Sequence, residues 1–366
     1  SLRERPGVEV QVICVDDGST DGTRSLLAEL ATQDPRLLVL HQEHAGQSVA
    51  RNLALDHATG RYVCFLDSDD YWQPDATGAE TPARCDEGTE VGSSATPCEE
   101  SGEGSGGISL AGLIRHADDN DLDLLMFDAE TLREPGVRDD LWQRLHGYYQ
   151  RPGSYRTPLA GVDLLAALKS GGHYRASACL YLVRRELLTG HGLRFQPGIA
   201  HEDNLFTFAV LLAAGRAAHL PVPLYARRLR PGSTMSASFR VTRARGYFVC
   251  AVEMLRLVRG RQFEPEVADQ VAAVIHRVVQ YARAAAVRLD PELIADLGAL
   301  YPHDPDAKVL TALLAEARAA HQLAATPGPG GPTALPPRQG LPRQADRVVR
   351  GLKDVLRCAT RSRRHG

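Results

Sequence analysis

Long apolar runs and paired cysteines are both missing from this sequence of 366 residues. No stretch of about 18 consecutive apolar residues occurs, and because a membrane-spanning helix needs roughly that many, we expect no transmembrane helix. No secretory leader pattern is visible either. The 7 cysteines are scattered and show no CxxC spacing. This pattern excludes a disulfide framework and predicts reduced thiols in a cytosolic protein.

An excess of basic charge is missing as well, because the formal net charge is −3. A protein that binds nucleic acid over its whole surface needs a basic balance, so we expect no nucleic-acid partner. Hydrophobic residues make up 43% of the chain and charged residues 24%, which are ordinary values for a globular protein. A chain of this length can bury a large core, as one large domain or as a domain with appendages.

The most informative stretch is an apolar run that ends abruptly in acids. Residues 63–66 read VCFL and are followed by Asp67-Ser68-Asp69-Asp70. Such a run predicts a buried strand of a mostly parallel sheet, whose ligand crevice lies at the carboxyl ends of the strands. Asp67 and Asp69 would project into that crevice, where carboxylate oxygens suit Mg²⁺ or Mn²⁺. An acidic turn without a ligand is the alternative interpretation.

Three further motifs accompany this stretch. A strand predicted over 9–15 ends in DDGSTDG, in which Asp21 is suited to cap the next helix. The segment 44–52 reads HAGQSVARN and leads into a helix predicted over 46–57. The triplet His201-Glu202-Asp203 opens a helix predicted over 202–212. Acids gather at the ends of expected strands and at one helix start, which predicts a shared site.

In this order, strand-VDDGSTDGT, GxSxARN, strand-LDSDD and a later ED resemble the inverting family 2 glycosyltransferases of the GT-A fold. The segment 198–235 is similar to the bacterial capsule and cell-wall polysaccharide branch of that family. The resemblance covers about residues 8–72 and 108–236. It implies an α/β nucleotide-diphospho-sugar transferase, Rossmann-like, with a mostly parallel sheet flanked by helices. Against the family pattern, we expect the first βα unit to be absent from this chain.

The resemblance also implies how the donor is bound. Asp17 accepts a hydrogen bond from the nucleotide base, and Asp16 supports its loop. Asp69 holds the metal, with Asp67 near the metal or the ribose. Arg51 packs beside the nucleotide, where a guanidinium reaches the base or the diphosphate in bidentate fashion. A surface arginine is the alternative for Arg51.

On the acceptor side, the resemblance makes Asp203 the general base and Glu202 its neighbour. The dipole of the helix that they open keeps a carboxylate ionised, although it also favours acids there without any catalytic role. Arg228 and Arg230 belong to an arginine-rich loop, RRLRPGST, over 227–234. Such a loop can close over a diphosphate and stabilise leaving-group charge, and a solvated basic hairpin is the alternative.

Together these motifs predict an inverting glycosyltransferase. It would move a sugar from a nucleotide-diphospho-sugar to a hydroxyl of a saccharide or lipid-linked acceptor, in cell-surface polysaccharide synthesis. A catalytically impaired nucleotide-sugar-binding or scaffold homologue is the alternative function. Another α/β phosphate enzyme would need a lysine close to the acids, and Lys169, Lys308 and Lys353 do not follow sheet strands there.

Composition divides the chain into four predicted parts. Residues 1–236 form the GT-A domain, with an insertion over 77–107 whose Gly, Ser, Glu, Thr and Pro content predicts disorder. A helical extension covers 237–323, and a Pro/Gly linker covers 324–342. Residues 343–366 read as a basic amphipathic helix, which can lie on an anionic membrane. We therefore expect a cytoplasmic protein, with this tail as a candidate contact to the inner face of the cell membrane.

Overall fold

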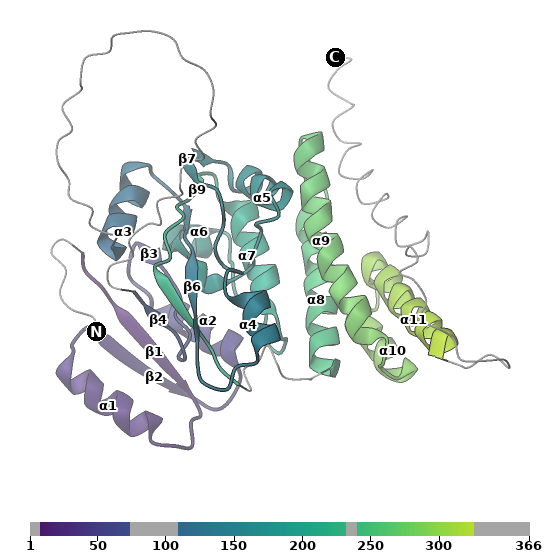
Figure 1. Ribbon diagram of the computed structural model, residues 1–366, viewed down its shortest axis with the longest axis horizontal. Coiled ribbons are helices and arrows are strands. Elements are labelled where there is room, and N and C mark those ends of the chain that lie inside the picture. Colours follow the sequence, from purple (N-terminus) through teal and green to yellow (C-terminus); the bar gives the residue numbers. More distant parts are fainter. Residues whose placement is uncertain (1–7, 74–108, 232–239, 326–366) are drawn as a thin grey trace, which may run out of the picture.

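A computed structural model describes residues 8–73, 109–231 and 240–325 (Figure 1). The insertion predicted over 77–107 and the basic tail predicted over 343–366 lie outside the described residues, as does the predicted linker beyond residue 325. The end of the arginine-rich loop, from residue 232, lies outside them too. No helix in the described ranges combines the length and the apolar character that a membrane crossing requires.

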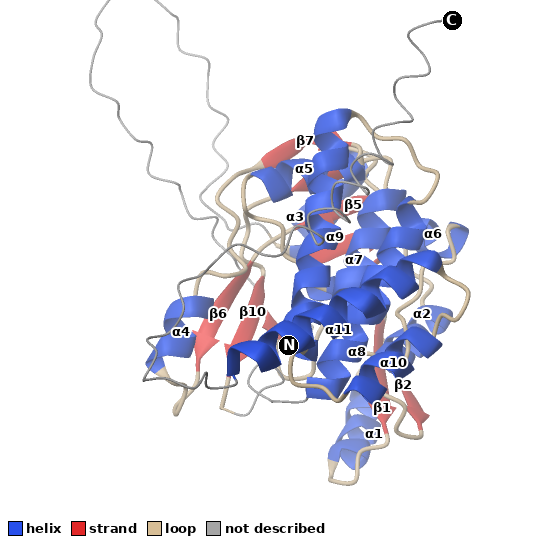
Figure 2. Ribbon diagram, turned by 90° about the vertical axis from the view of Figure 1, so that its right-hand side faces the viewer, coloured by secondary structure: helices blue, strands red, loops and turns tan. Residues whose placement is uncertain are grey.

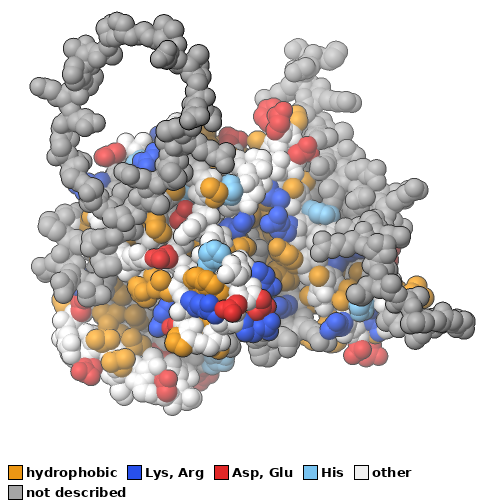
Figure 3. All heavy atoms as spheres, in the orientation of Figure 1, with side chains coloured by type: hydrophobic (Ala, Val, Ile, Leu, Met, Phe, Trp, Pro, Cys, Tyr) orange, Lys and Arg blue, Asp and Glu red, His pale blue; other side chains and the backbone are white. Residues whose placement is uncertain are grey.

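The N-terminal unit consists of two parallel strands and two helices: β1 (Val12–Asp17), α1 (Thr23–Gln33), β2 (Leu37–Gln42) and α2 (Gln47–His57). Val12 pairs with Leu37 and Asp17 with Gln42, so the predicted acids Asp16 and Asp17 are the last two paired residues of β1. Apolar side chains remain exposed on this unit (Figure 3), among them Leu26 at 56% and Leu30 at 40%. Its strands are therefore only partly covered.

The largest sheet has five strands in the order β3-β8-β5-β9-β7. Their bounds are β3 (Tyr62–Val63), β5 (Leu124–Met126), β7 (Tyr155–Leu159), β8 (Tyr181–Arg184) and β9 (Ala217–His219). The strand predicted to lead into the acids is short: β3 ends at Val63 and pairs antiparallel with β8. Phe65 still packs in the core, at 8% exposure, without joining a ladder. An apolar run reports burial, but it does not report backbone pairing.

A second sheet brings the arginine-rich strand to the acids. It has the order β4-β10-β6, with bounds β4 (Tyr71–Trp72), β6 (Ala129–Arg133) and β10 (Tyr225–Leu229). β10 is parallel to β6 and antiparallel to β4, which directly follows the acidic motif. Figure 2 shows β6 and β10 side by side. The α/β class is confirmed, but pairing in the described ranges is mixed rather than mostly parallel, because apolar runs carry no information on strand direction.

Helices cover these sheets. They are α3 (Leu110–Asp119), α4 (Asp139–Leu145), α5 (Gly161–Ser170), α6 (Arg185–Gly190) and α7 (Glu202–Ala213), with a short 3₁₀ helix at Ala178–Leu180. α7 is buried over most of its length, including Leu205, Phe206 and Phe208. Because α7 begins at Glu202, its packing in the core fixes where the predicted acceptor-side acids emerge.

The C-terminal part is helical, as predicted. It contains α8 (Arg240–Val258), α9 (Pro265–Ala286), α10 (Pro291–Ala299) and α11 (Pro305–Ala325). These helices gather on one side of the sheets (Figure 1), and Figure 2 shows α8, α10 and α11 from that side. α8 packs on α7 and α9 packs on α5, so the helical part shares one hydrophobic core with the sheets. α7, which begins with the predicted acceptor-side acids, is thus packed between the sheets and α8.

Candidate active site

Arg51 lies at the centre of the site and contacts three of the predicted carboxylates. Its Nη2 donates to Asp67 Oδ1 at 2.8 Å, and its Nη1 donates to Glu202 Oε1 at 3.0 Å and to Asp203 Oδ1 at 3.3 Å. Only 10% of the Arg51 side chain is exposed. One guanidinium therefore joins the acid predicted for the donor side to the two predicted for the acceptor side.

An aromatic floor holds Arg51 in place. Its guanidinium lies 5.0 Å from the centre of the Phe195 ring and 5.9 Å from that of Phe65. Phe195 in turn stacks on Phe206 of α7 at 3.8 Å. The next residue of the ARN motif, Asn52, donates to Phe195 O at 2.8 Å and accepts from Phe195 N at 2.9 Å. The two polar residues of this motif thus act together, because Asn52 fixes the ring on which Arg51 lies.

Glu202 and Asp203 differ in their surroundings. Burial and, to a lesser extent, the charge of Asp203 together raise the pKa of Glu202 to about 7, while the charge of Arg51 opposes the rise. Burial also raises the pKa of Asp203, and Arg51 again opposes it. The Glu202 side chain is 10% exposed and that of Asp203 30%. Arg51 and the backbone N–H of Ala178 both bind Oδ1 of Asp203, so within the described part of the chain its other carboxylate oxygen is open.

The acidic motif offers a place for a cation. One oxygen each of Asp67, Asp69 and Asp70 lies within 4.8 Å of the others. The oxygens of Asp70 are engaged, because Oδ1 accepts from Arg228 N at 2.8 Å and Oδ2 from the Tyr225 hydroxyl at 2.8 Å. Asp67 and Asp69, with 35% and 31% of their side chains exposed, are the more open pair. The hard oxygen donors fit Mg²⁺ or Mn²⁺, and Asp70 anchors the loop.

Arg228 of β10 and Arg230, which follows the end of that strand, contact this motif. Arg230 Nη2 donates to Asp69 Oδ2 at 2.8 Å, and Arg228 contacts the carbonyl of Asp69 through Nε. Arg228 also pairs with Glu134 at 3.4 Å. Arg230 therefore neutralises the open carboxylate of Asp69, and it is half-exposed and free to exchange that partner for another anion.

Asp16 and Asp17 form a separate cluster at the end of β1. Asp16 accepts from Ser19 N at 3.0 Å and from Arg24 at 3.3 Å, and its role in supporting a nucleotide-binding loop stays a prediction. Asp17 accepts from Gln42 at 2.6 Å, from the N–H groups of Ala45 and Gly46 at 2.8 and 2.9 Å, and contacts His44 at 3.0 Å. These four partners use both oxygens, so a nucleotide base would have to displace one of them. The base-binding role of Asp17 stays a prediction.

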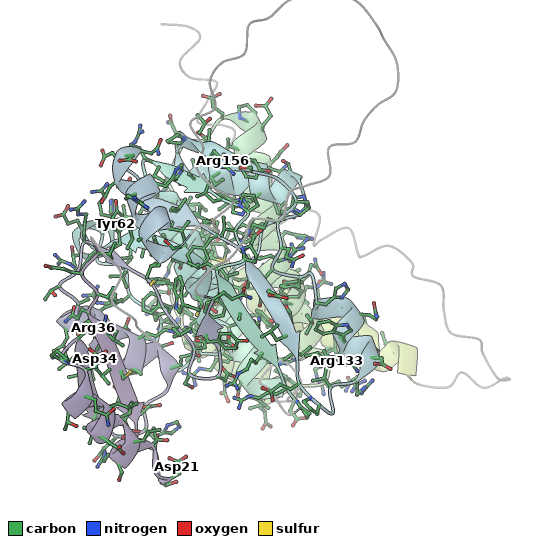
Figure 4. All side chains as sticks on the ribbon, turned by 60° about the vertical axis from the view of Figure 1, so that its left-hand side comes forward. Asp21, Asp34, Arg36, Tyr62, Arg133 and Arg156 are labelled. Carbon is green, nitrogen blue, oxygen red and sulfur yellow. The ribbon has the colours of Figure 1, made fainter. Side chains whose placement is uncertain are left out.

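α2 connects the two clusters. Gly46 N donates to Asp17, while the next residue, Gln47, donates to Asp67 at 3.1 Å. Asp21, by contrast, lies at the outer tip of the N-terminal unit (Figure 4) and accepts from Thr23 N at 2.9 Å at the start of α1. This contact is a local turn before the helix: the N-cap residue of α1 is Gly22 and no described side chain caps it, so the prediction that Asp21 caps α1 is wrong.

Two residues of the site had no individual role assigned from the sequence: Arg227, which was placed only within the arginine-rich loop, and Tyr225. Arg227 contacts the Tyr149 hydroxyl, and its charge lowers the pKa of Asp203, although burial raises that pKa overall. Tyr225 accepts from Asp67 N at 3.2 Å as well as donating to Asp70. Both lie on β10, where alternation places Tyr225 and Arg227 on the face opposite Arg228. That alternation is the sequence signal that could have identified them.

Comparison with known proteins gives relatives that are glycosyltransferases by name. A family model described as "Glycosyl transferase family 2" matches residues 1–87. Among curated proteins, the chain is 27% identical over 226 residues to "Uncharacterized glycosyltransferase YibD" of Escherichia coli, covering 62% of this chain and 54% of YibD. It is 53% identical over 66 residues to "Putative teichuronic acid biosynthesis glycosyltransferase TuaG" of Bacillus subtilis, covering 18% of this chain and 26% of TuaG. The chain thus spans about half or less of the length of these relatives.

A solved structure shares the fold. Residues 1–349 of S. aureus TarS, determined in complex with UDP-GlcNAc, superpose with a TM-score of 0.55 at 20% sequence identity. The match covers 85% of this chain and 79% of the TarS chain. At this identity the likeness establishes the fold alone, and it extends over the helical part as well as the sheets.

Proposed function

We propose that this chain, a family 2 glycosyltransferase of GT-A fold, transfers a sugar from a nucleotide-diphospho-sugar to a hydroxyl group of a saccharide or lipid-linked acceptor. The observation that carries the proposal is the Arg51 guanidinium, which joins Asp67 to Glu202 and Asp203. Donor-side and acceptor-side acids, far apart in the sequence, meet within the reach of one side chain. A transferase needs this closeness, because its two substrates must react at one point.

The donor would lie against the acidic motif and β10. Asp67 and Asp69 would hold Mg²⁺ or Mn²⁺, which would supply positive charge beside the leaving diphosphate. Arg230 and Arg228 would add guanidinium contacts to the phosphate oxygens once Arg230 leaves Asp69. Asp16 and Asp17 would order the loop near the base. UDP-GlcNAc in the TarS complex supports a nucleotide-sugar as the donor class.

The acceptor would be activated by Asp203. Its open carboxylate oxygen would take the proton of the acceptor hydroxyl as that oxygen forms a bond to the anomeric carbon. The bond to the nucleotide diphosphate breaks with its electron pair on the diphosphate, and configuration inverts because attack comes from the opposite face. Glu202, beside it, shares the charge of Arg51. The name of TuaG, which speaks of teichuronic acid biosynthesis, supports a place in building a cell-envelope saccharide.

Calorimetric titration of UDP, with and without Mn²⁺, tests the donor half of this proposal. We expect binding that requires Mn²⁺ and is lost in Asp69→Asn. Asp140→Asn is the matched control, because Asp140 is an exposed aspartate of α4 paired with Arg138. This variant should bind UDP as the unmodified chain does. Equal, metal-independent binding by both variants would contradict the assigned metal site. Absence of binding for UDP, GDP and dTDP alike would contradict the donor class.

A further inference from the structure

The helical part touches the site at one tight junction. A Cβ added to Gly246 of α8 would lie 2.1 Å from the carbonyl oxygen of Ala200, so only glycine permits this approach. Cys250, one turn further along α8, donates from its thiol to His201 O at 3.5 Å. His201 itself has a left-handed backbone, with φ of 64°. α8 is therefore pinned against the two residues that precede Glu202.

Aromatic rings extend outward from this junction. The rings of His201 and Tyr247 are stacked, with centroids 4.3 Å apart and planes 7° from parallel. Tyr281 of α9 follows, with its ring centroid 5.2 Å from that of Tyr247. Tyr281 is 42% exposed, so the outer end of this group of rings is accessible to a ligand. A row of three rings thus begins one residue before the acceptor-side acids and ends at the surface.

A second aromatic group approaches from the loop after α4. Tyr148 is 37% exposed, and the Arg175 guanidinium lies 4.5 Å from the centre of its ring. Tyr148 packs edge-on against Tyr149 at 4.8 Å, and the Tyr149 hydroxyl is the partner of Arg227. Burial is the main cause that raises the pKa of Tyr247 to about 12; the charge of Arg243 opposes the rise, and the nearby phenols of Tyr281 and Tyr148 contribute to it. The two aromatic groups are therefore neighbours, and both lead to Asp203.

The inner end of the aromatic row carries an uncharged polar atom. His201 Nε2 is buried and, among the residues that the structure describes, has no hydrogen-bond partner. Burial lowers the pKa of His201 to about 4, with the charge of Arg243 adding to the effect, so its ring is uncharged near neutral pH. An unpartnered neutral imidazole nitrogen suits a hydroxyl group better than a phosphate. Tyrosines offer a flat apolar face with a polar tip, which matches the mixed faces of a sugar ring and not an acyl chain.

We propose that His201, Tyr247, Tyr281 and Tyr148 form the acceptor subsite, and that it binds a saccharide ring of the acceptor. This inference rests on the proposed function, because the subsite matters only if Asp203 receives an acceptor hydroxyl. A sugar unit lies against the phenol rings, and one of its hydroxyls bonds to His201 Nε2. The helical part thereby completes the site: α8 and α9 supply the surface that positions the acceptor.

Saturation-transfer NMR tests the subsite directly. The probe is a mixture of cellobiose, maltose, lactose and chitobiose, added to the full chain with UDP and Mn²⁺, with irradiation of the aromatic protons. We expect saturation to reach the ring protons of at least one disaccharide, and we expect Tyr281→Ala and Tyr148→Ala each to reduce that signal at least fivefold. Val309→Ala is the matched control, because Val309 is 45% exposed on α11 and takes no part in the aromatic row. It should leave the signal unchanged.

UDP titration of the same variants separates this inference from the proposed function. We expect Tyr281→Ala and Tyr148→Ala to bind UDP with Mn²⁺ as the unmodified chain does. No saturation of any disaccharide, or equal saturation in all variants, would overturn the subsite while UDP binding continued to support the donor site. Loss of UDP binding in both tyrosine variants would also overturn it, because the rings would then serve the donor. Failure of the unmodified chain to bind any nucleotide is the distinct result that refutes the proposed function.

Discussion

Replacing Arg51 by methionine is the perturbation that most directly tests how the site is held. Methionine keeps the apolar length of the side chain over Phe195 and removes the charge that Asp67, Glu202 and Asp203 share. The three carboxylates then lose the cation that they share, and the charge of Arg227 acts only on the Asp203 side of the group. We expect the folded state to be destabilised, by an amount that depends on how many of these carboxylates are ionised.

The magnitude follows from burial and from the pKa of the partners. Removing one partner of a buried ion pair costs about 3–5 kcal/mol, and Arg51 and Glu202 are both about nine-tenths buried. The pKa of Glu202 is about 7 with Arg51 in place, and without Arg51 the pKa of Glu202 and that of Asp203 both rise further. As the pH falls through this range, protonation removes the repulsion. We therefore expect a loss of about 3–5 kcal/mol near pH 8.5 and roughly 2 kcal/mol or less near pH 5, where mainly the packing on Phe195 is lost.

Urea denaturation of the variant and of the unmodified chain at both pH values measures this difference. Arg51→Lys is the matched control, because it keeps the charge and loses only the forked geometry, and it should cost less than Arg51→Met near pH 8.5. A loss for Arg51→Met that is the same at both pH values would refute the reasoning. In that case Arg51 would stabilise the fold by packing on its aromatic floor and not by neutralising the acids.

Three further changes have defined outcomes. In the unmodified chain, the free energy of unfolding should fall by about 3 kcal/mol as the pH rises from about 4.5 through 7, because the folded chain holds the proton of Glu202 more tightly than the unfolded chain does. Glu202→Gln should remove this fall, and denaturant midpoints across this pH range measure it. Asn52→Ala should cost about 1–3 kcal/mol, since the N–H and C=O of Phe195 lose their partners, and a cost below about 0.5 kcal/mol would show that Phe195 needs no clamp. Gly246→Ala should cost about 1–3 kcal/mol through its clash with Ala200, despite the better helix propensity of alanine, and should lower the disaccharide signal; an increase in melting temperature would contradict the tight junction.

Much of the fold follows from sequence periodicity. The strand Val12–Asp17 and the helices Gln47–His57 and Glu202–Ala213 lie close to their predicted ranges, and helices occupy the extension predicted over 237–323. The short strand before the acids could not be predicted, because Phe65 is buried by Phe195 and Phe206, which are distant in the sequence. Antiparallel pairing of β8 with β3 and β5 is set by how the chain returns to the sheet, which local apolar content does not encode.

The site shows the same division between local and long-range information. Motif order brought Asp67, Glu202, Asp203 and Arg230 forward as candidates, and the structure brings them around one edge of the sheets. The three carboxylates that Arg51 contacts could not be predicted, because a guanidinium group indicates an anionic partner but does not identify it. Residue pairs separated by about 150 positions, such as Arg51 with Glu202, exist only after α2 and α7 have packed. The aromatic row across α8 and α9 depends on the close contact of Gly246 with Ala200, and a single glycine within a helical sequence does not predict such a contact.

The most direct test of sugar transfer is release of nucleoside diphosphate from a panel of UDP-, GDP- and dTDP-sugars, with Mn²⁺ and the four disaccharides as acceptors. We predict that the unmodified chain releases nucleotide from at least one donor, and that Asp203→Asn slows this release by about 10²–10⁴-fold, the range for a general base, while still binding the nucleotide. Metal-dependent nucleotide binding without release from any donor would contradict the account and favour a nucleotide-sugar-binding scaffold. Release by Asp203→Asn at an unchanged rate would contradict the role of Asp203.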